Sequence, residues 1–165
     1  MAVLPKQSML FPAAAEDLMR RALLVSHTSA FWGQAQLYVG LSGKSDWNWS
    51  NSDIASQVSE PTYWTGYSRK VVQGVEGTSG WQLRTTGTGD STMRYWETAD
   101  LVQWAYSGSG QTGYLLSAFL STAPQADSGG QLLAAALFRE IGQLEKPGDI
   151  LRFRFGFIVP WRVYW

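Results

Sequence analysis

The closing segment of the chain alternates apolar and polar residues with a period of two. In "DILRFRFGFIVPW", one face carries Leu151, Phe153, Phe155, Phe157 and Val159, and the other carries Arg152, Arg154 and Gly156. Only a strand with one buried face explains this spacing. The pattern predicts one half-buried strand, with an arginine pair opposite the phenylalanines that either docks onto a neighbour or is simply solvated.

Shorter stretches rich in β-branched and aromatic residues precede this strand. They are residues 36–41, 67–72, 92–97, 101–106 and 131–138. Segments rich in Gly, Ser, Asp and Asn separate them, and these residues form turns. Short strands at this spacing, without an internal repeat, predict a mainly β fold: an antiparallel β-sandwich or jelly roll.

The N-terminal part of the chain follows a different pattern. Residues 1–12 contain Pro5 and Pro12 and cannot be helical throughout, whereas apolar residues recur at helical spacing over residues 13–25. We therefore expect an extended N-terminal arm, residues 1–12, and a single domain, residues 13–165, that opens with one short helix. The arm is either a frayed end or an apolar strap on a neighbouring subunit. Its candidate interface residues are Val3, Leu4, Met9, Leu10 and Phe11.

Charge and composition exclude several classes of partner. The 165 residues include 13 Lys or Arg and 13 Asp or Glu, so the formal net charge is zero. Such a balance gives no general attraction to nucleic acid or to anionic lipid, and we expect neither as a partner. With no cysteine in the chain, disulfides and thiolate metal sites are excluded. We find no signal-peptide pattern and no apolar run of membrane-spanning length, and we expect a protein that is not exported.

One glycine motif raises the possibility of a cofactor. Gly108, Gly110 and Gly113 have the G-x-G-x-x-G spacing of a dinucleotide-binding loop. That loop must lead into an amphipathic helix, but the segment that follows is apolar on nearly every side and reaches Pro124 after about ten residues. A glycine-rich hairpin between two strands is the better interpretation.

Other catalytic or metal-binding patterns are weak. His27 is the only histidine and follows the predicted helix, where an imidazole ordinarily contacts the last carbonyl groups. The acidic residues are scattered singly and form no calcium-loop motif; examples are Asp46, Asp53, Asp90 and Asp100. We expect no catalytic site, no cofactor and no metal, and therefore no enzymatic activity.

Large aromatic residues stand out in a long polar stretch, residues 42–66. They are Trp47, Trp49, Tyr63 and Trp64, and two further tryptophans, Trp161 and Trp165, lie in the terminal "WRVYW". Rings in a polar loop stack on sugars, enter a protein–protein contact, or fold back over the end of the sandwich. All six residues are therefore interface candidates, with the folded-back arrangement as the structural alternative.

Five motifs follow one another along the chain: "LYVGL" (37–41), "GYSRKVV" (66–72), "GYLLSAFL" (113–120), "SGGQLL" (128–133) and "PGDILRFRFGFIV" (147–159). Their order resembles a family of small bacteriophage structural proteins usually labelled tail-fibre or baseplate-associated. The resemblance covers nearly all of the chain from about residue 14. It implies a β-sandwich component of the virion without enzymatic activity. It also implies structural roles for Gly66, Tyr67, Arg69, Gly129 and Gly130.

The chain departs from the family pattern in its proline-containing arm, its tryptophan-rich loop and its aromatic ending. Capsid cement proteins also hold their lattice with arms and aromatic rims, so the position of this protein in the particle, on the head or on the tail, is not decided by the sequence. The resemblance implies other virion proteins and copies of the chain itself as partners, and assembly in the bacterial host cytoplasm into the virion. A capsid decoration protein and a carbohydrate-binding module that contacts a glycan are the alternatives.

Overall fold

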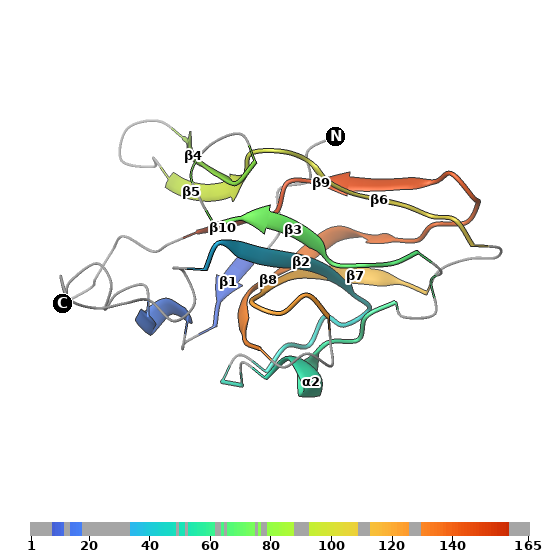
Figure 1. Cartoon of the computed structure of the whole chain (residues 1–165), viewed down its shortest axis with the longest axis horizontal. Coiled ribbons are helices and arrows are strands. Elements are labelled where there is room, and N and C mark those ends of the chain that lie inside the picture. Colours follow the sequence, from blue (N-terminus) through green and yellow to red (C-terminus); the bar gives the residue numbers. More distant parts are fainter. Residues whose placement is uncertain are drawn as a thin grey trace.

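A computed structural model gives the fold of the chain (Figure 1). It describes residues 8–11, 14–17, 34–48, 50, 51, 53–61, 64, 66–74, 76, 79–87, 93–108, 113–125 and 130–158. Within these residues the protein is mainly β and its strands pair antiparallel. The predicted fold class, an antiparallel β-sandwich, is confirmed at this level.

A five-stranded sheet forms the centre of the molecule, in the order β1-β8-β7-β2-β3. The strands are β1 (Ser8–Leu10), β2 (Gln36–Ser42), β3 (Lys70–Gln73), β7 (Leu115–Ser121) and β8 (Leu132–Gly142). The middle strands are apolar on both faces, as expected of a sheet that is covered on both sides. β1 and β3 are its two edges.

A second layer covers one face of this sheet. It contains a three-stranded sheet, β10-β5-β4, and a two-stranded sheet, β6-β9. The strands are β4 (Trp81–Thr86), β5 (Met93–Thr98), β6 (Val102–Ala105), β9 (Ile150–Phe153) and β10 (Gly156–Ile158). In Figure 1, β4, β5, β6 and β9 lie above the central sheet.

The prediction of one continuous closing strand is wrong, because the segment is divided into β9 and β10. Thr98 N donates to Phe155 O at 2.8 Å, and four residues further along Val102 pairs with Phe153. Three residues, 99–101, therefore lie opposite the single residue Arg154. This bulge bends the pair and interrupts the ladder. The predicted burial of the phenylalanines is nevertheless confirmed for Phe153, Phe155 and Phe157.

The opposite face of the central sheet is covered by the polar stretch that follows β2. This stretch contains a short helix, α2 (Ile54–Gln57), which lies below the sheet in Figure 1. Gln57 Oε1 accepts a hydrogen bond from Asn48 N at 2.8 Å, and Gln57 Nε2 donates to Asn48 O at 2.9 Å. The buried Gln57 side chain thus holds the neighbouring Trp47 against the sheet. The sequence pattern did not predict this helix.

Part of the predicted N-terminal arm belongs to the domain. β1 pairs with β8 of the same chain, and Phe11 is fully buried in the core. The boundary between an arm of residues 1–12 and a domain of residues 13–165 is therefore wrong at residues 8–11. Residues 14–17 are helical, as predicted, and residues 18–25 of the expected helix lie outside the described residues.

The predicted glycine-rich hairpin is also wrong in its pairing. β6 pairs with β9, whereas β7 pairs with β2 and β8, so the connection between β6 and β7 crosses from one layer to the other. The segment that follows Gly113 is the strand β7 and not a helix. The local structure that a dinucleotide-binding loop requires is therefore not present here.

Candidate interface at the β3 edge

The aromatic residues predicted to meet partners are buried wherever the structure describes their side chains. Phe11, Trp47 and Trp64 are 0, 6 and 3% exposed, which contradicts their assignment as surface contacts. Leu10 is half-buried against the core, and the side chain of Met9 lies outside the description. The remaining candidates also lie outside the described residues: Val3, Leu4, Trp49, Tyr63, Trp161 and Trp165.

Two aromatic clusters explain this burial. Trp47 packs between Phe11 and Phe119, with ring centroids 6.3 and 6.1 Å apart. Trp64 packs against Tyr67 and Tyr106 at 5.8 and 5.6 Å. The Phe11–Trp47 and Trp64–Tyr106 pairs are edge-to-face and the other two are tilted, and this packing makes the rings part of the chain's own core. For Trp47 and Trp64 the folded-back arrangement is therefore the correct one.

The exposed apolar side chains lie elsewhere, mainly on strands. Among the described residues, the large ones are Val71, Leu83, Leu101, Tyr114 and Ile150. Val71 and Leu101, which are 50 and 46% exposed, line one cleft of about 420 Å³ between β3 and β6. The buried side chains of Val72 and Val102 also line it. No pattern in the sequence predicted this cleft.

β3 presents one unpaired backbone edge toward the cleft. Gly74 N donates to Ala35 O at 2.9 Å, and this bond shows which residues of β3 are hydrogen-bonded to β2. The backbone groups of residues 70 and 72 bond to β2, and those of residues 71 and 73 point away from it. Gln73 N is bonded to Ser79 O at 3.2 Å. The outward N–H and C=O of Val71 have no hydrogen-bond partner within the described part of the chain.

The walls of the cleft are held in place at both ends. At one end Trp104 Nε1 on β6 donates to Ser68 O, just before β3, at 2.8 Å. At the other end Gln73 N on β3 donates to Ser79 O at 3.2 Å, and Ala99 N, beside the bulge, donates to the adjacent Gly80 O at 2.9 Å. These cross-connections fix the separation of β3 from the bulge that carries Leu101. Hydrogen bonds at both ends therefore hold the walls of the cleft at the edge of the sandwich.

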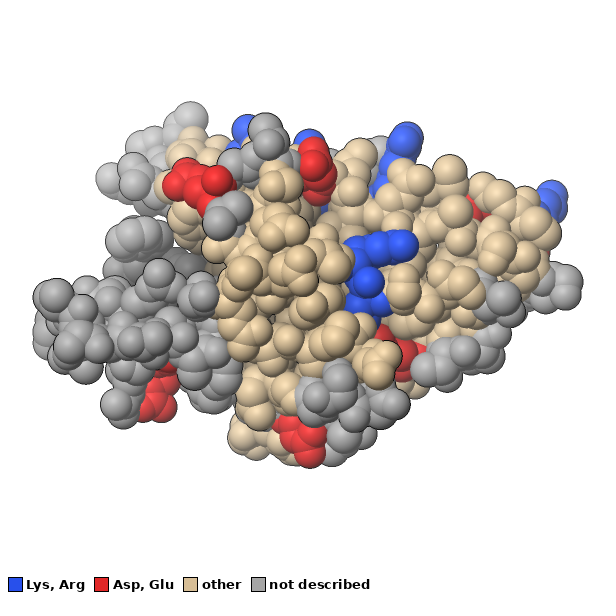
Figure 2. Space-filling model, in the orientation of Figure 1, with Lys and Arg blue, Asp and Glu red and all other residues tan. Residues whose placement is uncertain are grey.

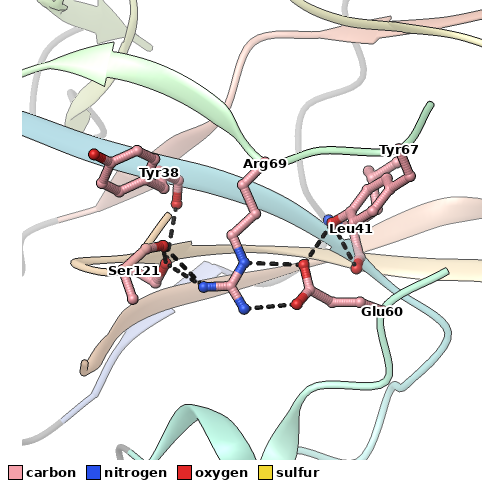
Figure 3. Close-up of polar contacts among 7 residues, drawn as sticks. Tyr38, Leu41, Glu60, Tyr67, Arg69 and Ser121 are labelled. Atoms are coloured by element: carbon pink, nitrogen blue, oxygen red, sulfur yellow. Dashed lines mark hydrogen bonds and ion pairs between the residues drawn. The ribbon is translucent and has the colours of Figure 1, made fainter. Parts of the chain in front are cut away.

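A buried ion pair anchors β3 from below (Figure 3). Arg69 donates to Glu60 through Nε, at 2.9 Å to Oε1, and through NH2, at 2.6 Å to Oε2. Arg69 NH1 donates to Ser121 Oγ at 3.2 Å and to Ala123 O at 2.9 Å. The guanidinium carbon also lies 4.9 Å from the centre of the Phe119 ring. A buried charge requires such complete pairing.

Tyr67 extends the same network to β2. Its hydroxyl donates to Glu60 Oε1 at 2.7 Å and accepts a hydrogen bond from Leu41 N at 2.9 Å. Burial, followed by the negative charge of Glu60, raises the pKa of Tyr67 well above its usual value. Tyr67 and Arg69 thus act as structural residues here, and Gly66 before them has a positive φ of 87°.

Two side chains of opposite charge lie at the cleft and form no ion pair with each other. Lys70 and Asp100 both line it, yet within the described residues neither side chain makes an ion pair or hydrogen bond. Charged residues elsewhere are also scattered: Figure 2 shows a face that is mostly neither acidic nor basic. Of the predicted arginine pair, Arg152 is exposed, and Arg154 lies 3.7 Å from Glu97 Oε1.

The scattered acidic residues of the sequence remain apart. Asp46, Asp53 and Asp100 are exposed, while Asp90 and His27 lie outside the described residues. No group of three His, Cys, Asp or Glu side chains within the described ranges is arranged to hold a metal ion. In the same part of the chain, no helix has the length and apolar character of a membrane span.

A comparison of the sequence with models of known protein families finds no match, and a comparison with curated proteins finds none either.

Proposed function

We propose that the protein is a non-enzymatic structural component of a bacteriophage particle, associated with the tail or baseplate. The ordered sequence motifs suggest this class, and the mainly β sandwich is compatible with it. Its partners would be other virion proteins and further copies of the chain. Its working state would be the assembled particle.

One observation carries the proposal. Val71 and Leu101 stand exposed beside the sheet edge at β3, whereas most of the described tryptophans and phenylalanines are packed into the core. Proteins that remain monomeric usually protect such edges with charges, prolines or covering loops. β3 is short and begins with Lys70, but the exposed side chain and the outward backbone groups of Val71 are left uncovered by the described residues, which favours a role in assembly, where a neighbouring subunit covers them.

Antibody labelling of purified phage particles tests this function. We expect electron micrographs to show label at the tail or baseplate, and antibody absorbed with the pure protein serves as the control. Label on the head would instead identify a capsid decoration protein. Particles that carry no label, from lysates that contain the protein, would overturn the virion assignment.

The burial of Trp47 and Trp64 removes the main support for the carbohydrate-binding alternative. Sugar-binding modules stack exposed rings on the sugar, and these two rings are 6 and 3% exposed. Affinity electrophoresis in gels that contain polysaccharide tests this alternative. Under the proposed function, mobility is the same with and without the polysaccharide.

A further inference from the structure

We propose that two copies of the chain associate through β3, in an antiparallel pair centred on Val71. The role of this dimer in particle assembly rests on the proposed function. The association itself is a property of the isolated protein. A monomer in solution would therefore overturn this inference and leave the virion assignment to the labelling experiment.

The backbone of Val71 provides the first argument. Its N–H and C=O point outward from the sheet and have no partner among the described residues. In an antiparallel pair, two residues that face each other can exchange both of these bonds. When both residues are Val71, a two-fold axis passes between them, which is the symmetry of most homodimers. The next outward N–H, that of Gln73, is already bonded to Ser79 O, so the exchange is limited to the two Val71 residues.

The side chain of Val71 provides the second argument. It is 50% exposed although it belongs to a β-branched, apolar residue. In the proposed pair the two Val71 side chains lie on the same face and directly opposite each other, where β-branched side chains pack well. Association therefore removes apolar surface from water on both copies. Leu101, at the rim of the same cleft, lies beside the incoming strand.

The charges at the cleft favour a second copy over an unrelated strand. The pair centred on Val71 places Lys70 of one copy opposite Val72 of the other, with both side chains on the same face. Val72 faces the second layer, where Asp100 lines the cleft. Each copy thus brings a lysine toward the unpaired aspartate of the other. A two-fold contact satisfies both charges at once, and the zero net charge of the chain adds no repulsion between copies.

The contact is small, because β3 contains only four residues. Stable dimers usually bury more than about 1,200 Å². We therefore expect a weak dimer in solution, whose population rises with concentration, and stronger association where a particle brings many copies together. Sedimentation velocity from about 1 µM to about 500 µM covers the affinities expected of such a contact.

Substitution of Val71 by proline is the sharpest test of the pairing. Proline removes the outward N–H, which makes no bond in the single copy, and edge strands tolerate it at such positions. We expect Val71→Pro to weaken the dimer at least tenfold. Val71→Thr, which keeps the N–H and the branched shape, should still dimerise. Val71→Asp serves as a second variant if the proline variant melts early, because two carboxylates would then face each other.

A single engineered cysteine tests the position of the axis. The chain contains no cysteine, so Val71→Cys introduces the only thiol, and mild oxidation should link two copies through it. Leu83→Cys, at an exposed position on β4, is the matched control and should remain mostly unlinked. A protein that stays monomeric over the whole range overturns the inference. A dimer that is insensitive to Val71→Pro and Val71→Asp, or is linked equally well through residue 83, also overturns it.

Discussion

Arg69 and Glu60 face each other across the loop that precedes β3, joined by two hydrogen bonds of 2.9 and 2.6 Å. Their side chains are only 1 and 4% exposed. Water cannot solvate either charge, so each depends on the other. The pair connects the polar stretch below the sheet to the residue that immediately precedes the edge strand β3.

Loss of the carboxylate charge should strongly destabilise the fold. Glu60→Gln leaves the Arg69 guanidinium buried without a counter-charge, and we expect the free energy of unfolding to fall by about 3–5 kcal/mol. Urea denaturation followed by tryptophan fluorescence measures this change. Arg84→Ala is the matched control, because Arg84 pairs with Glu97 while its own side chain is 49% exposed. It should cost less than about 1 kcal/mol. Equal losses in the two variants would contradict the role assigned to burial.

Alkaline pH should destabilise the protein through Tyr67. The pKa of this phenol is raised by its burial and by Glu60, so it stays neutral in the folded state where the unfolded chain ionises. The contribution of the Tyr67 phenol to the free energy of unfolding is complete below about pH 10 and is lost as the pH rises above that value. The stability difference between the natural chain and Tyr67→Phe should shrink by about 1.4 kcal/mol per pH unit in this range. A difference that is constant from pH 8 to pH 12 would disprove the assignment.

The period of two in the sequence predicted the fold class and the buried phenylalanines, but it could not locate the break between β9 and β10. Phe153, Phe155 and Phe157 alternate without interruption along the sequence. The break results from the partner strand, which carries three residues, 99–101, opposite Arg154. Register is a property of two strands, so one strand's pattern does not reveal it.

The prediction of the contact residues was wrong for a related reason. Trp47 lies among polar residues, which suggests exposure, but Gln57 of α2 bonds to the backbone of the adjacent Asn48, and the Trp47 ring packs against Phe119 on β7. Val71 and Val72 are identical in type and adjacent on the same edge strand, but their side chains point to opposite faces of the sheet, and only Val72 packs against the second layer. Strand order depends on contacts that are distant in sequence. The local pattern therefore could not identify the cleft.

Gly40 should be intolerant of any side chain. A Cβ at this position would overlap the ring of Phe119 on the neighbouring strand β7. We expect Gly40→Ala to cost about 1–3 kcal/mol in the free energy of unfolding, the usual cost of overpacking. Because the obstacle is one side chain, Phe119→Leu should cost less in the Gly40→Ala background than alone. Additive effects in this double-mutant cycle would show that the two positions do not interact.

Trp104 should hold β6 to the start of β3 through a single polar atom. Its indole N–H donates to Ser68 O at 2.8 Å, while its ring stacks on Phe153 with centroids 5.6 Å apart. Trp104→Phe keeps an aromatic ring but removes this donor, so we expect a loss of about 1 kcal/mol from the hydrogen bond, together with some packing loss. The more specific expectation is faster amide hydrogen exchange at Lys70 and Val72, whose N–H groups bond to β2, because the start of β3 is released. Trp81→Phe is the control: Trp81 packs against Phe157, away from this end of the cleft, and its loss should leave exchange at these amides unchanged. If both variants accelerate exchange at the β3 edge equally, the effect is general loosening of the core and the indole bond does not position the strand.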